Sequence, residues 1–197
     1  FYVKRITEML DLVSEFKDKK EFKLDIPQSL IKTLKKLFDP SKKYIGIAPG
    51  SHEARKIWPI DRYLEVAKFY EKKGFTIVFF LGPEEQNLRK IIVNMLDEPL
   101  FPEEDIKDYS GIEVVMASTY YLDIAITNDS GTGQMLSTNI CPLLKICGPV
   151  SAIKFINNQF TNIDFIASQS FGGDDINLIT THAVINKIDK ILDSDTL

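Results

Sequence analysis

Hydrophobic and polar positions follow two different periods along the chain. Short continuous apolar runs bounded by Gly, Pro, Asn or Asp predict strands, and the run 75–81 is typical of a strand that is buried on both faces. The predicted strands are residues 44–48, 75–81, 123–127, 142–147 and 163–167. Apolar residues that recur every three or four positions predict helices instead. The predicted helices are residues 2–16, a segment that opens at Pro27 and stops before Asp39, and residues 61–73, 84–96, 112–121, 131–139 and 179–192.

This alternation of strands and helices predicts an α/β fold. Strands that are joined through helices form βαβ units with right-handed crossovers, and therefore a parallel sheet. We expect a Rossmann-like parallel sheet with helices on both faces. Residues 1–41 are expected to form a helical linker or appendage outside the sheet, and residues 42–197 the domain itself. The breaks in residues 97–108 predict a surface loop.

Composition and charge exclude several classes of protein. With 24 Lys and Arg against 28 Asp and Glu, the net charge is −4, which argues against a nucleic-acid partner. Two cysteines and two distant histidines make neither a disulfide framework nor a metal set. No apolar run approaches the roughly 20 residues of a membrane span. We expect a cytoplasmic protein without a bound metal. Because the chain begins with Phe1 rather than Met, we expect a fragment or a processed product.

Ligands of open parallel sheets bind beyond the carboxyl ends of the strands. The segments that follow the predicted strands are therefore the candidate binding segments. They are Pro49-Gly50-Ser51-His52, Gly82-Pro83-Glu84-Glu85, Asn128 to Gln134, and Gly148-Pro149-Val150-Ser151.

The segment Asn128 to Gln134 runs from a strand into a helix and offers two interpretations. Its glycines permit close approach of the backbone, and the free N–H groups of a helix start favour a phosphate. Ser130 and Thr132 would then add hydroxyl donors. Alternatively, Asp129 or Ser130 is simply the N-cap of the helix. The segment is neither a GxGxxG nor a Walker motif, so dinucleotide or NTP binding is not indicated.

The other segments also leave alternatives open. Lys56 is either a mobile charge for a phosphate or a solvated surface lysine. Glu84 and Glu85 either bind ribose hydroxyls or are simply acidic residues in the first turn of a helix, where the helix dipole stabilises negative charge. Trp58 is expected to be a packing anchor, and His52 an exposed loop residue.

The ordered set of motifs resembles the C-terminal half of glycosyltransferase family 9, the lipopolysaccharide heptosyltransferases. The resemblance runs from about residue 40 to the end of the chain. The matching motifs are Ile47-Ala48-Pro49-Gly50-Ser51, Lys56-Ile57-Trp58-Pro59 with Tyr63, Phe80-Leu81-Gly82-Pro83-Glu84, Asp108-Tyr109-Ser110-Gly111, Ile126-Thr127-Asn128-Asp129-Ser130-Gly131, Cys141-Pro142 and Cys147-Gly148-Pro149. The family has the GT-B fold, in which two Rossmann-like domains enclose the active site and the C-terminal one holds the nucleotide-sugar donor.

This resemblance implies a role for each matching residue. Lys56 would contact the donor's diphosphate, with Ser51 in the loop beneath it. Glu84 or Glu85 would lie near the ribose, and the Asp129 motif would hold the sugar and the diphosphate. The predicted donor-binding residues are Ser51, Lys56, Glu84, Asp129, Ser130, Gly131, Thr132 and Gln134. Gln134 departs from the family, which usually has His there, and Gln carries no charge.

The resemblance also implies an activity for the whole enzyme. It would transfer a sugar from a nucleotide-diphosphate donor such as ADP-heptose to a lipopolysaccharide-type acceptor, without a metal or other cofactor. The general base is expected in an N-terminal acceptor domain that these 197 residues lack, as is any peripheral contact with the inner membrane. The alternative is a non-catalytic nucleotide-sugar-binding or interaction module, which Gln134 and the lacking half favour.

Overall fold

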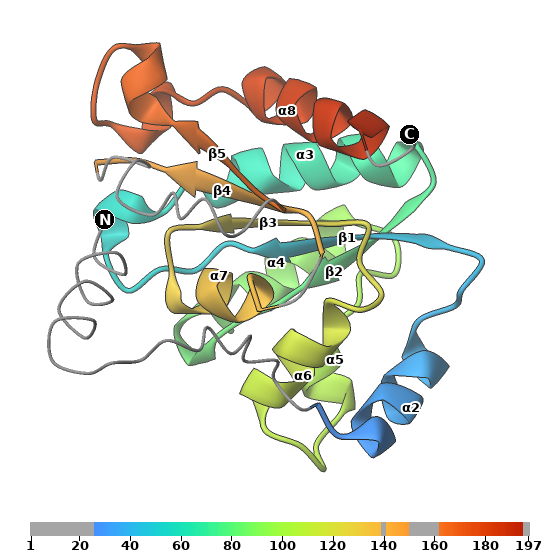
Figure 1. Cartoon of the computed structure of the whole chain (residues 1–197). Helices are drawn as coiled ribbons and strands as arrows, with labels where there is room; N and C mark the ends of the chain where they lie inside the picture. Colours follow the sequence, from blue (N-terminus) through green and yellow to red (C-terminus); the bar gives the residue numbers. More distant parts are fainter. Residues whose placement is uncertain (1–25, 139–140, 150–161, 195–197) are drawn as a thin grey trace, which may run out of the picture.

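The computed structural model describes residues 26–138, 141–149 and 162–194. In this described part, all strand pairings are parallel and form one sheet with the order β2-β1-β3-β4-β5 (Figure 1). The strands are β1 (Lys43–Ala48), β2 (Phe75–Phe79), β3 (Ile124–Asn128), β4 (Leu143–Cys147) and β5 (Ile163–Ala167). The predicted fold class and the five predicted strands are therefore confirmed. The predicted helix 2–16 lies outside the described residues.

Helices cover both faces of this sheet (Figure 1). The α-helices are α2 (Gln28–Leu37), α3 (Ile60–Lys72), α4 (Leu88–Met95), α5 (Pro102–Asp105), α6 (Gly111–Ser118), α7 (Gly131–Leu136) and α8 (Thr181–Ser194). Short 3-10 helices follow several strands, namely η1 (Ala54–Lys56), η2 (Pro83–Glu85), η4 (Ser168–Phe171) and η5 (Ile176–Leu178). Helices α3, α4 and α8 pack on one face, and α2, α6 and α7 on the other.

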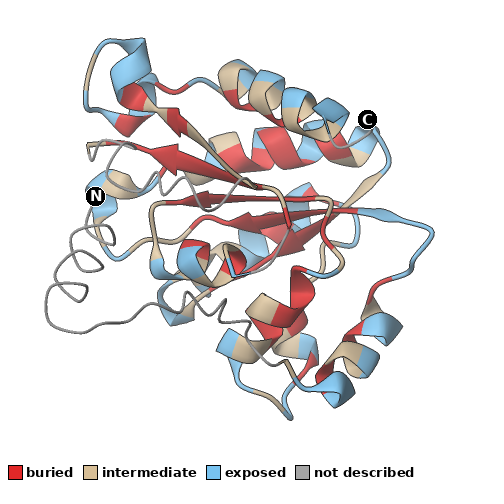
Figure 2. Ribbon diagram, viewed as in Figure 1, coloured by how far each residue is buried: buried red, intermediate tan, exposed pale blue. Residues whose placement is uncertain are grey.

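Strand side chains alternate between these two faces and so build two apolar cores. Ile45, Ile47 and Ile126 belong to the core under α3 and α8, whereas Ala125 and Leu143 belong to the core above α6 and α7. The central strands are almost wholly buried (Figure 2). Burial on both faces explains why their sequences are continuous apolar runs rather than alternating ones.

Helix α2 takes no part in the sheet but packs against α6 and contributes to the second apolar core. Leu30 and Leu34 are fully buried, and the ring of Phe38 stacks on that of Tyr121 with centroids 4.9 Å apart. The Tyr121 hydroxyl donates a hydrogen bond of 2.8 Å to the carbonyl of Ile31. The described end of the expected linker thus contributes to the second core, and a division of the chain at residues 41 and 42 remains a prediction.

The segment 97–108 corrects the sequence analysis, because it is not a plain surface loop. Leu100 forms a parallel bridge with Val78, and Phe101 and Pro102 are buried beside the short helix α5. Leu100, Phe101 and Pro102 are consecutive and do not recur at the spacing of a helix, so the sequence pattern did not indicate that the segment is anchored. The predicted helix 84–96 also differs, since it is divided into η2 and α4.

Candidate functional site

Strands β1 and β3 are neighbours in the sheet, and the chain leaves them toward opposite edges of the sheet. From β1 the chain proceeds to the edge strand β2, whereas from β3 it proceeds toward β4 and β5. This is a topological switch point, where the two loops diverge and leave a crevice at the carboxyl edge. The Ser51 hydroxyl bridges the two loops by donating to the backbone carbonyl of Asp129 at 3.3 Å.

Lys56 and Asp129 meet at this switch point, although they are far apart in sequence. Lys56 Nζ lies 3.2 Å from Asp129 Oδ2 and 2.8 Å from Glu53 Oε1. Its side chain is 17% exposed and that of Asp129 only 11%. The hydrogen bond with Glu53, with a smaller contribution from Asp129, raises the pKa of Lys56. The lysine is therefore a charged, partly buried group held by two carboxylates, rather than a freely solvated surface lysine.

A fully buried amide fixes the relative position of the two loops. Asn128 Oδ1 accepts hydrogen bonds from the backbone N–H of Trp58 and from the Tyr63 hydroxyl, both at 3.0 Å. Its Nδ2 donates to the Pro49 carbonyl at 2.5 Å. Trp58 is itself fully buried and donates from Nε1 to the carbonyl of Ile179 at 2.9 Å, which confirms its predicted packing role. The last residue of β3 thus anchors the β1 loop and the start of α3.

The start of α7 agrees with the capping interpretation for Ser130. Its hydroxyl accepts a hydrogen bond of 3.1 Å from the backbone N–H of Gly133, so it is the N-cap. Gly133 lies so close to the strand that an added Cβ would be 2.9 Å from Thr127 Cγ2. In contrast, Gly131 is exposed and a Cβ there would meet no atom within 4 Å. Packing thus requires glycine at 133, whereas it does not require glycine at 131.

The structure distinguishes the two glutamates that follow β2. Glu84 is exposed on η2, whereas Glu85 is partly buried and reaches back across the neighbouring loop. A Cβ added to Gly50 would overlap the carboxylate of Glu85, and one added to Gly82 would lie 2.7 Å from its Oε2. Of the two residues, Glu85 is therefore the one beside the switch point. Gln134 is exposed on α7, and Thr132 is partly buried there.

A family model for glycosyltransferase family 9 (heptosyltransferase) matches residues 1–138. The chain belongs to glycosyltransferase family 9. The match covers all eight predicted donor-binding residues, whereas β4 and β5 lie beyond it.

Individual relatives agree with this family. Lipooligosaccharide heptosyltransferase 2 of Campylobacter jejuni is 29% identical over 150 residues, which are 75% of this chain and 46% of the relative. The lipopolysaccharide core heptosyltransferase OpsX of Haemophilus influenzae is 23% identical over 148 residues, 75% of this chain and 42% of that protein. The chain thus spans about half the length of the curated relatives that it matches.

A solved structure supports the same fold. That of the E. coli ADP-heptose heptosyltransferase II gives a TM-score of 0.74 at 18% identity, covering 92% of this chain and 56% of that one. The sheet and its helices therefore have the same fold as the matching part of that structure.

The sequence analysis missed two charged residues near the switch point of the family 9 chain, namely Glu53, which pairs with Lys56, and Lys145. Lys145 lies in the middle of β4, is only 3% exposed, and is within electrostatic reach of Asp129. Burial lowers its pKa, and burial likewise raises the pKa of the neighbouring Cys147 to about 12. The available signal was a lysine inside the apolar run that was predicted as the strand 142–147.

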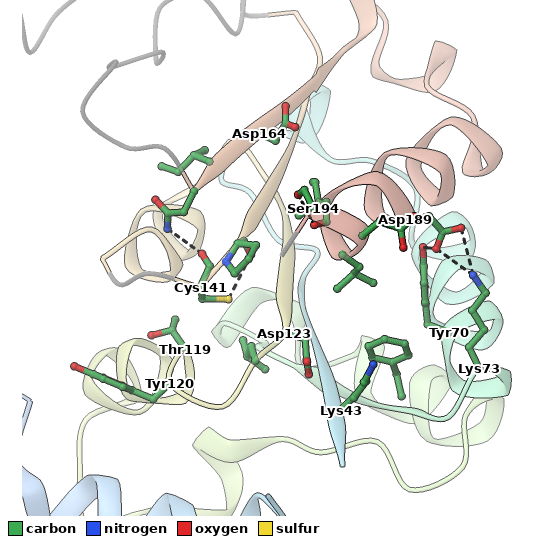
Figure 3. A pocket seen from close by; sticks show the side chains of 18 residues that line it. Lys43, Tyr70, Lys73, Thr119, Tyr120, Asp123, Cys141, Asp164, Asp189 and Ser194 are labelled. Atoms are coloured by element: carbon green, nitrogen blue, oxygen red, sulfur yellow. Dashed lines mark hydrogen bonds and ion pairs between the residues drawn. The ribbon is translucent and has the colours of Figure 1, made fainter. Parts of the chain in front are cut away.

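A large cavity lies at the opposite edge of the sheet. It has a volume of about 1070 Å³ and opens at the amino ends of the strands, between α8, α6 and the starts of β1 and β4 (Figure 3). Lys43, Asp123 and Asp164 line it, and Tyr70 and Lys73 both bind Asp189 at its rim (Figure 3). None of the predicted donor-binding residues lines this cavity. Because ligands of parallel sheets bind at the carboxyl edge, we assign the candidate site to the switch point.

Two further features complete the described part of the family 9 chain. Among the described residues, no group of three or more His, Cys, Asp or Glu side chains is arranged to hold a metal ion. None of the described helices is long and apolar enough to cross a membrane.

Proposed function

We propose that the switch point binds the diphosphate of a nucleotide-sugar donor. The observation that carries this proposal is the meeting of Lys56 with Asp129 across the loops that follow β1 and β3. Both residues are in the segment that matches the family. A solved structure with the same fold is that of the E. coli heptosyltransferase WaaC with ADP-2-deoxy-2-fluoro heptose. It has a TM-score of 0.63 at 15% identity and covers 84% of this chain and 45% of that one.

Each residue has a physical role in this proposal. The diphosphate replaces Glu53 as the partner of Lys56, because a lysine side chain is flexible and its ammonium binds phosphate as a point charge. Thr132 contributes a hydroxyl donor, and Ser51 holds the loop beneath the diphosphate through its hydrogen bond to the Asp129 carbonyl. Asp129 and Gly131 border the sugar. A carboxylate after β2 accepts hydrogen bonds from the ribose, for which Glu85 is better situated than Glu84.

In the whole enzyme, we propose that a sugar moves from an ADP-heptose-like donor to a hydroxyl of a lipopolysaccharide-type acceptor. Negative charge grows on the leaving diphosphate as the sugar bond breaks, so Lys56 stabilises the transition state more than the ground state. The acceptor hydroxyl needs a general base. We place that base outside the described residues, because Asp129 is engaged by Lys56. We also propose a cytoplasmic location, with residues 1–41 as the connection between the halves.

Substitution of Lys56 by Ala tests the proposed diphosphate site. Isothermal titration of the 197-residue chain should show ADP affinity reduced about tenfold or more, because a charged hydrogen bond is lost. Adenosine affinity should stay within about twofold, since the nucleoside does not reach Lys56. Lys187→Ala is the matched control, because Lys187 is also paired with a carboxylate, Asp164, at 2.7 Å. Equal losses for ADP and adenosine would contradict the assignment.

A non-catalytic binding module is the second candidate function. The observation that favours it is Gln134, an exposed and uncharged side chain at the candidate site. A transfer assay with radiolabelled nucleotide-sugar and a lipopolysaccharide-core acceptor tests whether this chain contains the general base. We expect the chain alone to transfer nothing, because positioning of both reactants supplies much of the rate. Transfer that Asp129→Asn abolishes would mean that the catalytic centre lies within this chain.

A further inference from the structure

Lys145 is a buried cation in an otherwise apolar strand. Its neighbours on β4, Leu144 and Ile146, are fully buried, and Lys145 itself is 3% exposed. Removing an ammonium from water is unfavourable unless the charge is paired or hydrogen-bonded. A lysine at this position therefore disfavours folding unless a partner compensates its charge.

The sheet register directs Lys145 toward the switch point. Lys145 pairs with Thr127 of β3, and side chains two residues apart on a strand share a face. Thr127 contacts Gly133 at the start of α7 and precedes Asp129 by two residues. Lys145 therefore lies on the face of the sheet that α7 covers, one strand away from the chain that leads into Asp129. The electrostatic influence of Asp129 on Lys145 agrees with this placement.

Within the described residues, no hydrogen bond or ion pair joins Lys145 Nζ to another side chain. Asp129, the carboxylate within its electrostatic reach, is already bound by Lys56 at 3.2 Å. The sequence of residues 150–161, which follows β4, contains neither Asp nor Glu. Lys56 is paired with two carboxylates, of which the diphosphate must displace Glu53, whereas Lys145 has no such competitor in the described chain.

We propose that Lys145 is a second donor-binding lysine, which contacts the diphosphate from the β4 side while Lys56 contacts it from the β1 side. This inference rests on the proposed function of the switch point. It assigns a distinct role to a residue that lies beyond the segment matched by the family model. The ligand group that it takes is a phosphate oxygen, whichever base the nucleotide carries.

Substitution of Lys145 by Met removes the charge and keeps most of the length of the side chain. Isothermal titrations use ADP, inorganic pyrophosphate and adenosine, with Lys187→Met as the charge-matched control. We expect Lys145→Met to weaken ADP and pyrophosphate about tenfold or more, with adenosine unchanged within about twofold. The ligand-free variant should unfold at the same or a higher temperature, because an apolar group replaces a largely buried charge that has no hydrogen-bonding partner among the described residues.

Two results would overturn this inference alone. In the first, Lys145→Met binds ADP and pyrophosphate as tightly as wild type does, although Lys56→Ala weakens the binding of both ligands. The other is a ligand-free Lys145→Met chain that is less stable than wild type, which would make Lys145 a structural residue. If wild type binds neither ADP nor pyrophosphate, the proposed function itself fails, and this inference fails with it.

Discussion

Removal of the Asn128 amide should destabilise the fold more than any exposed polar substitution. Its Oδ1 and Nδ2 make three buried hydrogen bonds, to the Trp58 N–H, the Tyr63 hydroxyl and the Pro49 carbonyl. Asn128→Ala leaves these groups without a partner, and each buried unsatisfied group costs about 1–3 kcal/mol. Allowing for partial relaxation, the free energy of unfolding should fall by about 3–5 kcal/mol. Tyr63→Phe removes one of the three bonds and should cost about 1 kcal/mol.

Urea unfolding followed by circular dichroism measures both changes, with linear extrapolation to water. Asn186→Ala is the control, because that amide is exposed on α8 and hydrogen-bonds only His182 among the described residues. It should change the stability by less than about 0.5 kcal/mol. If Asn128→Ala costs no more than this control, then Asn128 does not hold the two loops together, and the account of how the site is positioned is wrong.

Two further predictions concern carboxylates. Glu53→Gln should tighten ADP binding roughly fivefold at low salt, because Glu53 competes with the diphosphate for Lys56. This gain in affinity should shrink in about 0.5 M salt, which screens the competing charges. Weaker ADP binding by the variant would mean that Glu53 orients Lys56 instead. Burial raises the pKa of Glu103 from 4.5 to about 8. The folded chain therefore binds a proton that the unfolded chain has released, so stability falls as the pH rises from about 4.5 to 8. Glu103→Gln should remove this fall in stability. At about pH 8.5 its free energy of unfolding, measured by urea unfolding, should exceed that of wild type by about 1–2 kcal/mol after allowing for solvent screening. If the variant keeps the wild-type dependence of stability on pH, the burial of the Glu103 charge is not its cause.

The strands were predictable because burial on both faces leaves a simple signal, an apolar run between turn residues. The segment 97–108 was not, because Leu100 and Phe101 are anchored by a bridge to β2 and by burial beside α5. Such anchoring depends on contacts that are distant in sequence, and the acidic Pro102–Asp105 stretch shows no apolar period of its own.

The candidate site was predictable as a set of segments but not as a geometry. The strand-end rule selected Lys56 and Asp129, yet only the strand order could bring the loops after β1 and β3 together. Glu84 and Glu85 are equivalent in sequence, and the turn of η2 decides which of them reaches Gly50. Lys145 was missed because the strand-end rule selects residues that follow a strand, whereas Lys145 lies within one.

The most direct test of the central claim asks at which edge of the sheet the diphosphate binds. Two-dimensional ¹H–¹⁵N NMR spectra of the 197-residue chain, recorded during titration with ADP, report on each backbone amide. The account predicts the largest shift changes in residues 50–56, 82–85 and 128–134 at the switch point. Changes confined to the amino edge, around Lys43, Tyr70 and Asp189 in the large cavity, would contradict it.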